Sequence, residues 1–107
     1  MLISELEMIG LLRTAVDETA RRLHVQDTEW KSGEEILDLI AARDPETYNL
    51  LRAFLNAYID WFRFHKRIEN EGKQGHLGRE NTEELAKLVG ERNSSREAIL
   101  HRLAKLS

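Results

Sequence analysis

The sequence contains no cysteine, a single proline and no long run of apolar residues. Without cysteine there can be no disulfide bond, no zinc–thiolate site and no thiol nucleophile. No apolar segment approaches the ~20 residues that a membrane-spanning helix needs. The first ten residues, MLISELEMIG, carry acidic side chains where a secretory signal would be positively charged. These absences favour a soluble protein of the cytoplasm that does not bind membranes.

The composition is typical of a globular protein, with 41% hydrophobic and 33% charged residues in a chain of 107. The net charge is −3, but the charges are unevenly distributed. Residues 1–44 carry five Lys/Arg and ten Asp/Glu, whereas residues 45–107 carry eleven and nine. This polarity is mild compared with the pI above ~9 that marks a nucleic-acid-binding domain. We therefore expect one domain, 1–107, without a dominant charge.

Signals for the start of a helix recur along the chain, and no strand signal competes with them. At four places a Ser or Asn stands three residues before a Glu, a spacing that lets the first side chain satisfy a free backbone N–H group. These pairs are Ser4/Glu7, Ser32/Glu35, Asn81/Glu84 and Ser94/Glu97. The Asp44-Pro45 step adds a fifth start, because proline is tolerated at the first helical position. The sequence therefore predicts an all-α fold, a four- to five-helix bundle with helices at about 4–24, 33–43, 45–71, 82–90 and 95–106.

The predicted helix over about 45–71 is the longest, and we expect it to be central. Its apolar residues follow two seams with helical spacing, so it has to be covered from two sides. One seam consists of Tyr48, Leu51, Leu55, Tyr58, Phe62 and His65, and the other of Leu50, Phe54, Ala57, Trp61, Phe64 and Ile68. The first predicted helix has a single apolar stripe, formed by Leu6, Ile9, Leu12, Val16, Ala20 and Leu23. Trp30, in the polar loop that follows, is expected to fold over the core.

The short neighbouring helices offer less apolar surface than the two seams of the central helix need. A long helix with surplus apolar surface often completes its core across a two-fold axis. We therefore expect a homodimer, or a complex with another protein, formed through one seam. The expected dimer or partner seam is Tyr48, Leu51, Leu55, Tyr58 and Phe62.

The segment from 63 to 79 is the most basic in the chain, with five bases and two acids. Its bases are interleaved with aromatic residues, and this mixture is typical of surfaces that contact phosphates and stack on bases. The bases are Arg63, Lys66, Arg67, Lys73 and Arg79. Cations are also common at a helix C-terminus, where they complement the macrodipole. Binding of nucleic acid or another anionic partner by this segment is one alternative for function.

Residues 82–106 also resemble a helix-turn-helix unit. Ala86 and Gly90 stand four apart, as in the first helix and turn of such units, and Ile99 falls at a buried position of the second helix. Glu91 and Arg96 depart from the pattern, which calls for apolar residues there. The unit is a second way in which the chain could read DNA.

Three acidic residues of the second predicted helix, Glu34, Glu35 and Asp38, resemble half of the acidic signature of the all-α nucleotide pyrophosphatases of the MazG type. The resemblance implies a magnesium-dependent nucleotide hydrolase, which needs a second Glu-x-x-Glu element on another helix. No such partner stands in the right register upstream. As first-turn acids, these residues also complement the helix dipole. A magnesium-dependent hydrolase is therefore the third alternative.

No other residues form a recognisable catalytic or cofactor site. His65 and His101 each lie one turn from a glutamate, but the further inward glutamates of a helical di-metal site are missing. No nucleophile–base pair and no cofactor loop can be identified. We therefore expect no metal, no cofactor and no enzymatic activity. The leading hypothesis is a small helical protein-binding module that acts as an adaptor, regulator or subunit.

Overall fold

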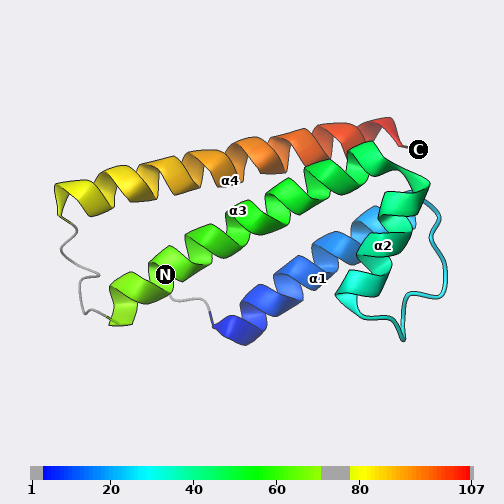
Figure 1. Ribbon diagram of the computed structural model, residues 1–107, viewed down its shortest axis with the longest axis horizontal. Coiled ribbons are helices and arrows are strands. Elements are labelled where there is room, and N and C mark those ends of the chain that lie inside the picture. The colour runs from blue at the N-terminus through cyan, green and yellow to red at the C-terminus, as the bar shows by residue number, and fades with distance from the viewer. Residues whose placement is uncertain (1–3, 71–77, 107) are drawn as a thin grey trace.

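The computed structural model describes residues 4–70 and 78–106, which form four helices (Figure 1). They are α1 (Glu5–Arg22), α2 (Gly33–Arg43), α3 (Pro45–Asn70) and α4 (Arg79–Lys105). No strand occurs in these two stretches, so the predicted all-α class is confirmed. The predicted end of the central helix at 71 and the glycines at 72 and 75 lie outside the described residues.

Three of the five predicted helix starts are capped as the sequence indicates. The Ser4 hydroxyl accepts a hydrogen bond from the Glu7 backbone N–H at 3.1 Å. Ser32 and Glu35 form a reciprocal capping box at the start of α2. Asp44 ends α2 with an extended backbone, and its carboxylate accepts a bond from the buried Thr47 hydroxyl at 2.8 Å.

The predicted break between helices at 82–90 and 95–106 is wrong, because α4 runs without interruption from Arg79 to Lys105. The Ser95 hydroxyl does not cap a helix start but donates to the carbonyl of Glu91 at 2.8 Å, inside the helix. Gly90 is exposed, and a glycine in a helix costs only about 1 kcal/mol relative to alanine. Packing of Leu88, Ile99 and Leu103 outweighs this cost. The helix-turn-helix geometry is therefore absent from 82–105.

Helix α3 lies at the centre and packs against each of the other three helices. In Figure 1, α4 follows α3 along its whole length, α1 lies on its other side, and α2 crosses one end. Over the described residues α3 has 26 residues and α4 has 27, because the two C-terminal helices predicted from the sequence form one. The molecule measures 46 × 26 × 17 Å.

The core is divided between the two ends of the molecule. At one end, which we call the closed end, α2 covers α1 and α3. The buried residues there come from all four helices: Val16, Ala20, Leu23, Ile36, Leu37, Ile40, Leu51, Leu55, Ile99 and Leu103. The other end has a smaller cluster, consisting of Met8, Trp61, Phe64, Ile68 and Leu88. Helix α2 contributes nothing to that second cluster.

Arg102 joins the C-terminal end of α4 to the corner between α2 and α3. Its Nη2 atom donates to the Asp44 carboxylate at 2.8 Å, and its Nε atom donates to the Thr47 hydroxyl at 3.2 Å. A further ion pair, at 3.2 Å, links Arg102 to Glu46. The hydrogen bonds from Arg102 and Thr47 lower the pKa of Asp44 from its ordinary value. We call this group the Arg102 network.

Two expectations for the first third of the chain are wrong. Trp30 is not a lid, because 94% of its surface is exposed. From this loop Val25, and not Trp30, packs against the core. Arg13 of α1 fixes the loop by donating a hydrogen bond to the Thr28 carbonyl at 3.1 Å. In the predicted stripe of α1, Leu6 and Ile9 are also exposed. Helix α2 is too short to cover them.

Candidate functional site

The exposed part of the α1 stripe identifies the candidate site. Val16 and Ala20 pack with α2 in the core of the closed end. Leu6 and Ile9 continue the same stripe at helical spacing, but they lie beyond the reach of α2 and are 82% and 61% exposed. We call this region, together with the adjoining surface of α3 around Phe62, the open half-face. Scattered exposed leucines are ordinary, whereas two neighbours on a stripe that is otherwise buried form an uncovered contact surface.

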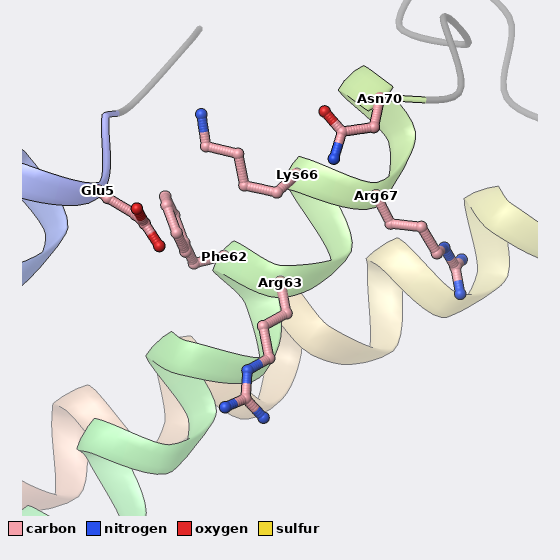
Figure 2. Close-up of a pocket in the computed structure, with 6 residues that line it drawn as sticks. All are labelled: Glu5, Phe62, Arg63, Lys66, Arg67 and Asn70. Carbon is pink, nitrogen blue, oxygen red and sulfur yellow. The ribbon is translucent and has the colours of Figure 1, made fainter.

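A hollow of about 510 Å³ lies where the start of α1 meets the end of α3 (Figure 2). It is lined by Glu5, Phe62, Arg63, Lys66, Arg67 and Asn70. In Figure 2, Glu5 and Phe62 lie next to each other, whereas Arg63 points away from them and Arg67 extends toward α4. The cations therefore surround the hollow without converging on one point. This arrangement suits a broad anionic surface better than a single phosphate group.

Two of the predicted basic residues form ion pairs with acids of their own helix. Lys66 pairs with Glu69 at 3.4 Å, and Arg79 pairs with Glu83 at 3.3 Å. The structure brings Arg63, Lys66 and Arg67 together on the last turns of α3. Arg79 begins α4, and the predicted contact residue Lys73 lies outside the described residues.

Arg67 is held between α3 and α4. Its Nη2 donates to the Asn81 amide oxygen at 3.3 Å, and its guanidinium lies 5.0 Å from the centre of the Phe64 ring. Phe64 is itself buried. Part of the basic segment therefore holds the two helices together, in addition to any contact with an anion.

The aromatic residues of α3 pack along the helix and are not splayed out for stacking. Tyr58 contacts Phe54 and Trp61 edge to face, with centroids 5.4 and 5.5 Å apart. Arg92 of α4 lies 4.6 Å from the centre of the buried Trp61 ring, and His65 lies 4.7 Å away on an edge. Burial lowers the pKa of His65, and Arg92 lowers it further.

The two predicted seams of α3 differ in burial: the second is buried at Ala57, Trp61, Phe64 and Ile68, whereas the first is buried only at Leu51 and Leu55. Leu51 and Leu55 of the first seam are in the closed-end core, at 1% and 6% exposure, so a partner has no access to them. Tyr48, Tyr58 and Phe62 are half-buried and border the surface. Of the expected partner seam, these three aromatic residues remain accessible, and Phe62 is the one in the open half-face.

The three acids of α2 do not form one site. Glu34 pairs with Arg52 of α3 at 3.2 Å, and Glu35 caps its own helix. Asp38 is exposed. Across 4–70 and 78–106, no three His, Asp or Glu side chains gather closely enough to hold a metal ion. The hydrolase hypothesis gains no site from this arrangement.

Sequence reasoning did not identify Leu6 and Ile9 as surface residues. The available signal was a comparison of lengths. The stripe of α1 extends over most of an 18-residue helix, while α2, the next helix in the chain, has 11 residues. An 11-residue helix spans about 16 Å, whereas 18 residues span about 27 Å. Part of the stripe therefore had to remain uncovered by α2.

No protein-family model matches the sequence, and neither a curated protein nor a solved structure is similar to it. Within the described stretches, no helix is both long and apolar enough to cross a membrane. The function has to be argued from the surface of the chain itself.

Proposed function

We propose that this chain is a small protein-binding module and that it binds through the open half-face. The observation that supports this proposal is the exposure of Leu6 and Ile9 on a stripe that is buried over the rest of α1. An apolar stripe of a helix is stabilised when a second helix covers it. The proposed role is binding and not catalysis, in the cytoplasm as the composition suggests.

The free energy that burial of these apolar side chains can contribute supports a role in binding. Burying a leucine or isoleucine side chain contributes about 1.5–3 kcal/mol. Leu6 and Ile9, with the exposed edge of Phe62, would therefore contribute several kcal/mol toward the cost of association, and about 4 kcal/mol separates millimolar from micromolar binding. In this proposal a homodimer or another helical protein completes the core through this surface, which shares only Phe62 with the partner seam predicted from the sequence.

The test compares Leu6→Glu/Ile9→Glu with Leu100→Glu as affinity baits in extracts of the source cells. Leu100 is a matched control because it is 47% exposed and lies on α4, away from the open half-face. We expect wild type and Leu100→Glu to recover the same protein, which is lost with the double variant. Recovery that is unchanged by the double variant, or no recovery combined with a monomeric wild type, would contradict the proposal.

Nucleic-acid binding through Arg63, Lys66, Arg67, Lys73 and Arg79 remains a prediction. It requires binding of mixed DNA or RNA that falls steeply with salt, and that falls further in Arg63→Ala/Lys66→Ala. Fluorescence anisotropy at low salt measures both effects. Absence of binding at low salt would eliminate this alternative.

A further inference from the structure

Helix α2 has the size that the open half-face needs. Its 11 residues extend about 16 Å. In Figure 1 it crosses one end of α1 and α3, and no other described helix lies across the opposite end. The 26 Å width of the molecule accommodates one helix of this length lying across α1 and α3. The same surface thus carries a projecting helix at one end and a place for one at the other.

We propose that the occupant of the open half-face is α2 of a second copy of this chain. A two-fold axis that runs across the face, perpendicular to its length, exchanges its two ends. The projecting α2 of each copy then lies on the open half-face of the other. The contact is isologous, closes with two copies and leaves no surface for further growth. The inference rests on the proposed function, because it names the partner of the same surface.

The charges of the two surfaces are complementary. Of the three acids of helix α2, Glu34 pairs with Arg52 and Glu35 caps its own helix, so Asp38 is the one directed to solvent. The one basic residue of the helix, Arg43, donates to the Leu23 carbonyl at 2.8 Å. The open half-face is bordered by Arg63 and Lys66 at the hollow, with Glu5 as its one acidic lining residue. Two copies joined through α2 therefore bring an acidic helix to a basic border twice.

The apolar contacts fit as well. Leu39 is 38% exposed on α2 and is the largest apolar side chain on the surface of that helix. In the proposed dimer it lies against Leu6 and Ile9 of the other copy. These apolar contacts would then form the centre of the interface, and the charged pairs would lie at its edge.

The absence of cysteine allows a direct test by cross-linking. We would compare Ile9→Cys/Leu39→Cys with each single variant under mild oxidation, on non-reducing gels and by sedimentation at tens of micromolar. Both sites are exposed, so folding should be preserved, and circular dichroism checks it. We expect a covalent dimer from the double variant and from an equal mixture of the two singles, but not from either single alone. Efficient cross-linking of Ile9→Cys alone would indicate an α1–α1 contact and overturn the proposal.

Charge exchange gives a second, independent test. Asp38→Lys should weaken the dimer by roughly five-fold, as expected for an exposed ion pair, and Lys66→Glu in the same chain should restore it. Loss without restoration would contradict the proposed pairing. A monomeric wild type that still captures another protein through Leu6 and Ile9 would overturn the second copy as partner and leave the binding function intact. A dimer that is insensitive to Leu6→Glu/Ile9→Glu would overturn both.

Discussion

The closed end and the open end of the molecule are built from the same three long helices, yet they bury their apolar residues to different extents. At the closed end, α2 covers α1 and α3, and Ile36 and Ile40 are completely inaccessible. At the open end no described helix covers α1 and α3 in this way, and Leu6 is 82% exposed. A single 11-residue helix accounts for the difference. The closed end therefore supplies stability within the chain, whereas the open end can gain stability from a partner.

Truncation of single apolar side chains should give the largest difference in stability between the closed end and the open end. Ile36→Ala, at 0% exposure, should lower the free energy of unfolding by about 2–5 kcal/mol, because it leaves a cavity. Leu6→Ala, at 82% exposure, should change it by less than about 0.5 kcal/mol in the dilute monomer. Urea denaturation followed by circular dichroism measures both. Similar losses for the two variants would show that the ends do not differ as described.

The Arg102 network should make the closed end more dependent on one arginine than the open end is. Arg102 contacts Asp44, Thr47 and Glu46, whereas Arg79, at the other end of the same helix, pairs with Glu83 among the described residues and is 93% exposed. Arg102→Ala should lower the melting temperature measurably, since it leaves the Asp44 carboxylate without its cation. Arg79→Ala should cost nothing measurable. Equal shifts of the melting temperature for the two variants would argue against a stabilising role of the Arg102 network at the corner between α2 and α3.

The same network should make the closed end sensitive to acid. The pKa of Asp44 is lowered in the folded state, so the folded state prefers the charged carboxylate. Its contribution to stability is present above the unfolded value of ~3.9 and is lost as the pH falls through the lower folded value. Asp44→Asn should therefore be less stable than wild type at neutral pH, and the difference should shrink toward pH ~2. Urea denaturation at several pH values measures this. A constant difference would contradict the assignment.

The smallest effect is expected where α4 passes from one end to the other. Gly90 lies inside a continuous helix, and a Cβ atom there would meet nothing within 4 Å. Gly90→Ala should therefore stabilise the protein by about 0.5–1 kcal/mol. If the chain instead turned at Gly90, the same substitution would be neutral or destabilising. Thermal unfolding decides between these outcomes.

The sequence predicted those parts of the fold that depend on local chemistry. The bounds of α2 follow from the Ser32 capping side chain and from Pro45, which prevents the residue before it from remaining helical. The two seams of α3 follow from periodicity alone. The continuity of α4 could not be predicted, because Ser94 and Glu97 have the capping spacing and only packing against α3 decides how they are used.

The candidate site depended on tertiary relations that periodicity cannot express. A stripe of apolar residues indicates which face of α1 is covered, but not how far along the helix the cover extends. Leu6 and Ile9 satisfy the same pattern as Val16 and Ala20, and they differ only in the reach of α2. The basic segment was easier to identify, since Arg63, Lys66 and Arg67 are close in sequence and lie on one helix.

The positions of the two tryptophans have a practical consequence. Trp61 is 7% exposed, with Arg92 and His65 against its ring, whereas Trp30 is 94% exposed. Their emission spectra should therefore be separable, with a blue-shifted component from the interior and a red-shifted, easily quenched component from the loop. Replacing Trp30 with phenylalanine would leave a single intrinsic probe at the junction of α3 and α4. The chain thus contains its own optical reporter for that junction.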